Sequence, residues 1–512
     1  MEQFTNLQSF LLEYHPAFSL TNNLLRVIIS IYITIGAFMN RKELLKQREI
    51  AKWEREKAKP KRQGYLAWLI FVVCLIYMTD EIASQIGTLM KTEIANDLLA
   101  SFGQSSVGVL DIITMVVVPF QLLGLVYKPL ADKWGRKTFL VINTFGMSFA
   151  MLLIFLSNNL VLYCLGSCLV QFFIPHDMHV VYIMETAPAK HRARIYSSIK
   201  FVANMGVMLV PILRRMLMEE ASQWRNVYVI PAIIGLVCSF IALISARETD
   251  AFIDARLRYL KMTDEEKAVA KTEKKTEAAE GGLGHALKFA FSHKQTKWLY
   301  ITSAFVNIGF LLILEYQVIM TYGYAEHFIR EGLFTSIEDA VNYAGVGVVT
   351  SALFLFTVGS AVAQVIMGFV CDWKGRKIAA ITMASICTLS FLGFFIGANL
   401  GWSAFIVGFL CGACIGSFYA TNDILIMMIG ESSPTNLRSS TISAQYVVTA
   451  AGVVLSYGVG LPLLTILGNS FAGIIVLCMA VPGFILALLS LCAKTHDTTG
   501  IDMDTVTGCE WD

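Results

Sequence analysis

The six residues Asp132-Lys-Trp-Gly-Arg136-Lys137 decide the fold of this chain, because they occur twice. The second copy, Asp372-Trp-Lys-Gly-Arg376-Lys377, follows 240 positions later (372 minus 132). Each copy is a short basic turn that contains a glycine and lies between two long apolar segments. A turn of this kind at corresponding points of two apolar regions indicates that the chain consists of two related halves.

A second motif repeats at almost the same spacing. Glu185-Thr-Ala-Pro188 precedes Arg192 and Arg194, and Glu431-Ser-Ser-Pro434 precedes Arg438. The two glutamates are 246 positions apart (431 minus 185). Two different motifs with nearly one offset strengthen the interpretation of two related halves.

The composition predicts an all-α, polytopic membrane protein. The chain has 512 residues, of which 56% are hydrophobic and only 15% are charged, whereas charged residues make up about a quarter of a typical soluble domain. Many stretches of about 18 residues or more carry no charge, which is long enough to cross a bilayer as a helix. The alternating short segments of a membrane barrel are not seen in the sequence.

Nothing in the sequence suggests a metal site or an enzyme. The eleven cysteines are scattered, mostly inside apolar runs, and lack the spacing of metal ligands. The sequence contains no phosphate-binding glycine-rich loop and no nucleophile elbow. We therefore expect no cofactor, no bound metal, no ATP coupling, no nucleic-acid partner and no enzymatic activity. The first residues also lack the pattern of a cleaved signal peptide.

Twelve transmembrane helices are expected, in two pseudo-symmetric six-helix bundles. The spans lie at about 65–90, 106–127, 138–156, 161–184, 195–218 and 227–246, and then at about 298–320, 346–370, 378–397, 402–429, 440–466 and 470–493. The corresponding domains are an N-terminal segment 1–63, a first bundle 64–246, a linker 247–297, a second bundle 298–493 and a tail 494–512.

The N-terminal segment contains one apolar and one charged stretch. Leu24–Met39 is short for a span and carries Arg26, so we favour an interfacial helix over a thirteenth, tilted span. Residues 41–62 are densely charged with an excess of Lys and Arg, which predicts a solvated helix on the cytoplasmic side.

The distribution of lysine and arginine predicts the orientation in the membrane. The basic loops are 127–137, 190–194, 247–297 and 374–377, whereas 157–159 is uncharged and 326–339 is acidic. Because basic loops remain in the cytoplasm, both termini and the linker are expected there. The membrane is expected to be a bacterial inner membrane or a plasma membrane.

These motifs resemble those of the major facilitator superfamily, whose loop between spans 2 and 3 reads approximately Gly-x-x-x-Asp-[Arg/Lys]-x-Gly-x-[Arg/Lys]. The second copy matches over Gly368–Lys377, although Trp373 stands where a basic residue is usual. The first copy matches from Asp132 onward and has Lys128 in place of the opening glycine. The resemblance covers about 65–495 and implies a monomeric transporter that works by alternating access.

The Glu-x-x-Pro-x-x-x-Arg elements after spans 4 and 10 are similar to those of sugar porters and organic-ion transporters in this superfamily, and Thr495–Val506 weakly resembles their cytoplasmic ends. The resemblance implies that the repeated loops latch the outward-facing state. The alternative is that they only anchor the chain by their charge. We favour the latch, a cytoplasmic gate formed by Asp132, Arg136, Lys137, Glu185, Arg192, Asp372, Arg376, Lys377, Glu431 and Arg438.

Polar residues inside the spans are candidates for substrate and proton binding, because a buried charge costs several kcal/mol unless it is paired or hydrated. In the family, spans 1, 4, 7 and 10 line the cavity. In this chain they carry Asp80, Glu81, Gln85, His176, Asp177, Asn307, Glu315, Tyr419, Asn422 and Asp423. Asp177 and Asp423 both lie eight positions before the glutamate of the second motif (185 minus 177 and 431 minus 423), which places them at equivalent depth.

An alternative remains for these acids, namely that they pair with Lys200, Arg214 or Arg215 of span 5. His176 could relay protons or simply form a hydrogen bond. Asp111 is expected near the outer end of span 2, where its charge costs less.

Two further patterns bear on the branch of the family. Span 5, at Gly206–Arg215, lacks the Gly-x-x-x-Gly-Pro stretch of many antiporters, and span 7, at Asn307–Gln317, lacks the Gln-rich stretch of sugar porters. We therefore expect a proton-coupled symporter of a small organic solute or ion, for which a cationic solute would suit the carboxylates. The alternatives are an uncoupled facilitator or a proton-driven exporter, and then a membrane sensor that does not transport.

Overall fold

The computed structural model describes residues 43–60, 64–115, 134–173, 182, 185–186, 199, 201–203, 205–263, 265–266, 283–434 and 438–500. Every regular element in these ranges is a helix. Nine helices of this described part are long and apolar enough to cross a membrane. The predicted all-α, polytopic membrane fold is confirmed, and the twelve-helix count is consistent with it.

The chain divides into two units, of which the smaller comprises Met1–Arg62 and Asp250–Lys267. In this unit the helix 43–58 packs against α15 (Asp250–Lys261). Trp53 lies edge-on to Phe252, with ring centroids 5.4 Å apart, and Arg256 binds Glu49 at 2.7 Å. The charged segment that we expected to be a solvated helix therefore buries one apolar face.

The larger unit comprises Gln63–Thr249 and Ala268–Asp512 and contains both predicted halves. The described helices of the first half are α3 (Tyr65–Leu89), α4 (Lys91–Leu98), α5 (Ser106–Thr114), α9 (Arg136–Phe155), α10 (Leu160–Phe173), α13 (Leu209–Leu217) and α14 (Asn226–Ser245). In this half α14 packs along α9 and α3, and α10 packs along α9. The domain boundaries given above remain predictions.

The second half contains the longest helices. They are α17 (Leu283–Ser292), α18 (Lys294–Asn307), α19 (Leu311–Arg330), α20 (Ile337–Tyr343), α21 (Thr350–Lys374), α22 (Arg376–Asn399), α23 (Ala404–Glu431), α24 (Arg438–Leu467) and α25 (Ala472–Lys494). A Cβ atom at Gly408 or Gly412 of α23 would lie 1.8 Å from a carbonyl oxygen of α21. Small residues thus bring α21 and α23 into close contact, as is common between membrane helices.

The two ends of the membrane unit can be told apart by their contacts. The Tyr65 hydroxyl, at the start of α3, accepts a hydrogen bond from Arg247 N, and the adjacent Glu248 accepts one from Arg136 N. The start of α3 and the first basic turn therefore lie at one end. Lys91 follows the other end of α3, and we call the end that holds Lys91 the distal end.

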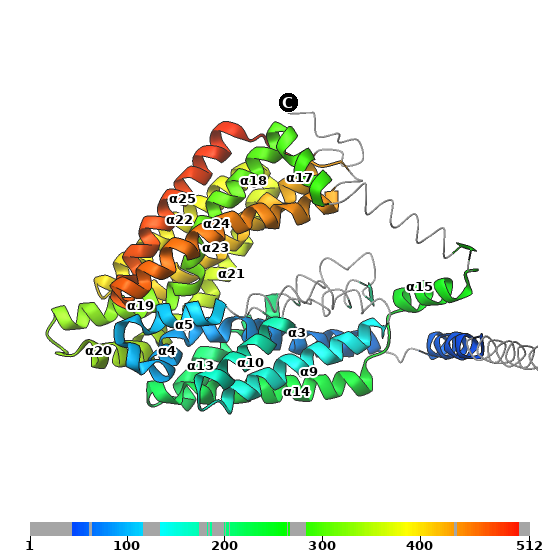
Figure 1. The fold of residues 1–512 in the computed structure, drawn as a ribbon, viewed down its shortest axis with the longest axis horizontal. Coiled ribbons are helices and arrows are strands. Elements are labelled where there is room, and N and C mark those ends of the chain that lie inside the picture. The colour runs from blue at the N-terminus through cyan, green and yellow to red at the C-terminus, as the bar shows by residue number, and fades with distance from the viewer. Residues whose placement is uncertain are drawn as a thin grey trace, which may run out of the picture. The chain divides into compact units, whose positions relative to one another are not determined.

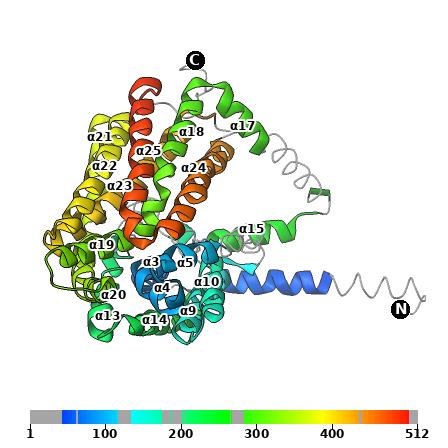
Figure 2. The ribbon, with the colours of Figure 1, turned by 60° about the vertical axis from the view of Figure 1, so that its left-hand side comes forward.

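The two halves meet near the distal end. There α4 contacts α19, α5 contacts α24, and α13 contacts α21. Figure 1 shows α3 to α14 as one layer and α17 to α25 as another, with α4 and α5 beside α19, and Figure 2 shows the same grouping from another side.

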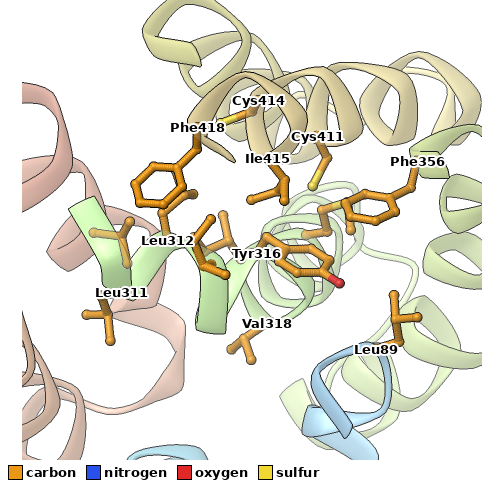
Figure 3. Close-up of a cluster of buried hydrophobic side chains, with 14 of the residues drawn as sticks. Leu89, Leu311, Leu312, Tyr316, Val318, Phe356, Cys411, Cys414, Ile415 and Phe418 are labelled. Atoms are coloured by element: carbon orange, nitrogen blue, oxygen red, sulfur yellow. The ribbon is translucent and has the colours of Figure 1, made fainter. Parts of the chain in front are cut away.

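A cluster of buried apolar side chains holds α19, α21 and α23 together (Figure 3). Tyr316 of α19 stacks on Phe356 of α21, with ring centroids 4.9 Å apart and an interplanar angle of 8°. Ile415 and Phe418 of α23 complete this part of the cluster, and Leu89 of the first half reaches it from α3. The aromatic pair is thereby fixed as a wall of the cavity described next.

Candidate functional site

A cavity of about 730 Å³ lies between the two halves of the membrane unit. Its polar lining comes from α3, α21 and α23 and consists of Glu81, Ser84, Gln85, Thr88, Thr357, Ser360, Gln364, Tyr419 and Asp423. Tyr316 and Phe356 supply an aromatic wall. The cavity thus combines carboxylates, amides and hydroxyls with an apolar surface, which is the usual make-up of a small-molecule site.

Four of the predicted cavity residues line this space. Glu81 and Gln85 are one helical turn apart on α3, and Gln85 Nε2 donates a hydrogen bond of 3.4 Å to Glu81 Oε2. Tyr419 and Asp423 are likewise one turn apart on α23, in the other half. A carboxylate from each half therefore borders the same cavity, although the role of these residues remains a prediction.

The structure places the other predicted cavity residues elsewhere. Asn307 and Asn422 form a hydrogen bond with each other, Nδ2 to Oδ1, at 2.8 Å. Asp80 lies half-buried on α3 and does not border the cavity. Glu315 is fully buried and binds Lys91. His176 and Asp177 lie outside the described residues.

The distal end contains five buried charged side chains: Lys91, Glu93, Asp111, Arg214 and Glu315. Lys91 Nζ lies 2.6 Å from Asp111 Oδ1 and 2.6 Å from Glu315 Oε1. Arg214 binds Glu93 through Nη2. The first of these groups joins the halves, because Glu315 belongs to the second half and Lys91 and Asp111 belong to the first. Arg214 and Glu93 both belong to the first half.

Arg214 was one of the alternative partners for the acids of spans 1, 4, 7 and 10, and the structure gives it a different role. Besides binding Glu93, it donates hydrogen bonds to Leu89 O at 2.6 Å and to Gly345 O at 2.8 Å. Its Nε atom also donates to Thr350 Oγ1 at 3.0 Å. Arg214 therefore binds both halves at once. Arg215 is exposed, and Lys200 lies outside the described residues.

The basic turn of the first half is held by two glutamates. Arg136 Nε binds Glu185 Oε1 at 3.1 Å, and Glu185 Oε2 accepts a hydrogen bond of 2.5 Å from Thr249 Oγ1. Glu248 Oε1 accepts hydrogen bonds from Arg136 N at 2.9 Å and Lys137 N at 3.1 Å. A carboxylate thus caps the N-terminus of α9, where the helix dipole favours negative charge.

The second half repeats this arrangement with equivalent residues. Arg376 Nε binds Glu431 Oε1 at 3.3 Å, and Glu431 Oε2 accepts a hydrogen bond of 2.5 Å from Thr498 Oγ1. Lys377 N donates to Asp497 Oδ1 at 2.9 Å at the start of α22. Asp372 is largely exposed, with its Oδ1 3.9 Å from Arg376 Nη1. Each arginine thus binds a glutamate of its own half.

Some of the predicted gate residues lie outside this description. Asp132 and Arg192 are not among the described residues, and of Arg438 only its position at the start of α24 is described.

Four residues of these networks were missed from the sequence: Glu248, Thr249, Asp497 and Thr498. They form an acid–threonine pair after the last span of each half, and the two pairs are 249 positions apart (497 minus 248). That offset is close to those of the other two motifs, so a search for short repeats could have found the pairs. Lys91 and Glu93 were missed because they directly follow an apolar span, where a charge normally reaches water.

The environment of Asp111 also differs from the one that we expected. It lies at the distal end, but it is only 5% exposed and its charge is balanced by Lys91 instead of by water.

Burial changes the ionisation of Glu248. Desolvation raises the pKa of this carboxyl above its ordinary value, and the hydrogen bonds from the backbone N–H groups of Lys137, Thr249 and Arg136 oppose that shift. The backbone N–H groups at the start of α9 thus stabilise the ionised form of Glu248, and burial destabilises it.

Comparisons with known proteins agree with these features. A model of the Major Facilitator Superfamily matches residues 69–338, which is 270 of the 512 residues (338 minus 69 plus 1). A model described as sugar (and other) transporter matches residues 306–496.

Among curated relatives, a facilitated glucose transporter homolog of Caenorhabditis elegans is 28% identical over 152 residues, which cover 28% of this chain and 28% of that protein. A high-affinity hexose transporter of Saccharomyces cerevisiae is 26% identical over 123 residues, which cover 23% of this chain and 20% of that protein. The match therefore spans less than a third of either relative.

Solved structures are similar over most of the chain. A D-xylose-proton symporter has a TM-score of 0.56 at 16% identity, covering 85% of this chain and 99% of that one. An inward-facing bacterial homolog of the human lysosomal transporter Spinster has a TM-score of 0.54 at 15% identity, covering 85% and 96%. At these identities the likeness concerns the fold alone.

Proposed function

Because the chain belongs to the major facilitator superfamily, we propose that it is a proton-coupled symporter that carries a small, hydroxyl-rich organic solute by alternating access. That it is a multi-pass membrane transporter follows from its family and fold. The proton coupling, the solute class and the location in a cell membrane with both termini in the cytoplasm belong to the proposal.

The observation that carries the proposal is the cavity between the halves. Glu81 and Asp423 border it from opposite halves, so a solute that binds both carboxylates would connect the halves. Gln85 and Gln364 add amide groups that both donate and accept hydrogen bonds. Binding at the interface of the two repeats is the general expectation for such transporters.

The chemistry of the lining favours a hydroxyl-rich solute of sugar size. Carboxylates and amides accept hydrogen bonds from hydroxyl groups, and Tyr316 and Phe356 add aromatic surface to the lining for the apolar side of a sugar ring. Span 7 lacks the glutamines of typical sugar porters, but in this chain glutamines reach the cavity from α3 and α21. The match of the second half to the sugar (and other) transporter model supports the same class.

The contacts between the halves suggest which state is present. With the basic turns in the cytoplasm, as predicted, the distal end is the outer end. Lys91, Arg214 and their partners join the halves there, so this state is closed to the outside. The inward-facing state of the Spinster homolog is consistent with this assignment.

Uncoupled facilitation is the second candidate, because one relative is named as a facilitated glucose transporter homolog. In that case a pH gradient would not drive accumulation of the solute.

Transport by proteoliposomes with an imposed inward proton gradient tests the proposal. A panel of sugars, polyols, organic cations and organic acids is offered, and accumulation of a neutral hydroxyl-rich solute above its external concentration is the expected result. Asp423→Asn should lose this accumulation, whereas Asp339→Asn, an exposed residue of α20, should retain it. Equal uptake with and without the gradient would leave the facilitator, and uptake of cations alone would overturn the solute class.

A further inference from the structure

The distal end contains a group of three charges that does not balance. Lys91 Nζ lies 2.6 Å from one oxygen of Asp111 and 2.6 Å from one oxygen of Glu315. The side chains of Lys91, Asp111 and Glu315 are 8%, 6% and 0% exposed. One ammonium therefore faces two carboxylates in a largely buried site.

Among the described residues, the neighbouring buried charges do not supply the missing cation. Arg214 is matched by Glu93, and Gln317 Nε2 also contacts Glu93 at 3.3 Å. The five buried charged groups that the structure describes at the distal end thus comprise two cations and three carboxylates, and one negative charge remains in excess. Burying an uncompensated charge is costly, so the cluster as a whole favours the uptake of one proton.

The hydrogen bonding of the two carboxylates leads to the same conclusion. Asp111 Oδ2 and Glu315 Oε2 are buried and have no hydrogen-bond partner among the described residues. Both carboxylates contact the same ammonium at 2.6 Å, so they lie side by side. Ionised carboxylates only accept hydrogen bonds, so the two side chains can satisfy each other only if one of them carries a proton.

We propose that Asp111 and Glu315 share one proton beside Lys91, and that this proton holds the distal end closed. This inference rests on the proposed function in one respect, because it assigns the proton of the symport to a site outside the solute lining. Asp111 and Lys91 belong to the first half and Glu315 to the second, so the site is complete only while the halves touch. The bound proton belongs to the pair and not to either residue.

The cluster lies between two cavities that have no lining residue in common. One of about 410 Å³ borders Lys91 and Asp111, and one of about 360 Å³ borders Thr92 and Glu93. The cavity of about 410 Å³ also shares Ser84, Thr88, Ile313 and Tyr419 with the solute cavity. Other titratable side chains that face this cavity are Tyr163, Tyr228 and Tyr457.

This placement gives a simple coupling scheme. When the distal end opens, Glu315 leaves Lys91, and Lys91 then balances Asp111 alone. Closing the distal end brings Glu315 back and requires a proton, which is taken up from the outside. Loss of that proton toward the solute cavity restores the excess negative charge and favours reopening of the distal end.

Infrared difference spectra of the purified full-length protein between acid and alkaline pH test the proton site. In the carbonyl stretching region of protonated carboxylic acids, we expect one component that titrates with pH in the parent protein and is missing in Glu315→Gln and in Asp111→Asn. Glu326→Gln on the same helix is the matched control and should keep the band. A second readout is the pH dependence with which a thiol reagent labels a cysteine introduced at Asn96, and this dependence should disappear in the same two variants.

The outcomes separate this inference from the proposed function. If neither Glu315→Gln nor Asp111→Asn loses any titrating component relative to the parent protein, the proton site is overturned, whether or not solute and protons move together. A band that is lost in these variants, in a protein whose solute uptake ignores a pH gradient, keeps the site and overturns symport. If one variant fails to purify as a monodisperse protein, the other decides the outcome.

Discussion

Lys91 of the first half and Glu315 of the second half form a buried ion pair, with Nζ and Oε1 2.6 Å apart. The two residues are 224 positions apart in the chain, and they meet where α3 ends and α19 passes it. Breaking a buried pair by removing one partner leaves an uncompensated charge, which costs about 3–5 kcal/mol.

Replacing Lys91 alone should therefore lower the stability of the protein much more than replacing both Lys91 and Glu315. We expect Lys91→Gln to lower the stability of the purified protein by about 3 kcal/mol, because the negative charge of the Asp111 and Glu315 pair is then buried without a cation. Lys91→Gln combined with Glu315→Gln should recover part of that loss. Thermal unfolding of the single and double variants measures the coupling, and strictly additive losses would contradict it.

Arg214 should not tolerate lysine. Its guanidinium donates to Leu89 O, Gly345 O and Thr350 Oγ1 while it binds Glu93, and a lysine has three donors on one atom and cannot reproduce this geometry. We expect Arg214→Lys to weaken closure of the distal end, seen as faster labelling of a cysteine placed there.

The adjacent Arg215 provides the matched control, since it is exposed. Arg215→Lys should behave as the parent protein. Equal labelling of both variants would show that Arg214 does not hold the halves together.

The glycines of the second basic motif should respond differently to alanine. Gly375 has φ = 92°, and a Cβ atom there would lie 2.4 Å from Asp497 Oδ2. Gly375→Ala should therefore cost about 1–3 kcal/mol from the backbone alone and disturb the contact of Lys377 N with Asp497.

Gly368 lies inside α21, and a Cβ atom there meets no described atom within 4 Å. Gly368→Ala should be neutral or slightly stabilising, because alanine favours a helix by up to about 1 kcal/mol. Thermal unfolding compares the two variants, and a greater loss at Gly368 would contradict the account of this turn.

Glu248 predicts a dependence of stability on pH. Burial raises its pKa in the folded chain above the ordinary value of 4.5, so between these two values the folded chain holds a proton that the unfolded chain has lost. The stabilising contribution is complete below pH 4.5 and is lost as the pH rises through the folded-state pKa. The melting temperature of the parent relative to Glu248→Gln should therefore fall as the pH rises from acid toward neutral. If the melting temperature of the parent relative to Glu248→Gln rises with pH instead, the hydrogen bonds at the start of α9 lower the pKa of Glu248 more than burial raises it.

More of the fold than of the site could be predicted from the sequence. Span 1, expected at about 65–90, is α3 at Tyr65–Leu89, and span 10, expected at about 402–429, is α23 at Ala404–Glu431. Long apolar runs and repeated motifs are local signals, so they can be read from one chain. Glu81 and Gln85 also share a cavity, as expected for residues one helical turn apart.

The distal network could not be predicted in this way. Lys91 follows an apolar span, and its partners Asp111 and Glu315 come from two other helices, one of them in the other half. Only packing of the halves brings these three side chains together. Because such contacts depend on packing, the sequence also did not identify Glu93 as the partner of Arg214.

The central claim is that solute and proton move together. The most direct measurement places the protein in liposomes with equal pH on both sides and clamped voltage, adds a hydroxyl-rich solute outside, and follows the internal pH with a trapped dye. The account predicts that entry of the solute acidifies the interior, and that Glu315→Gln abolishes the acidification. Solute entry without any change of internal pH in the parent protein would contradict proton-coupled symport.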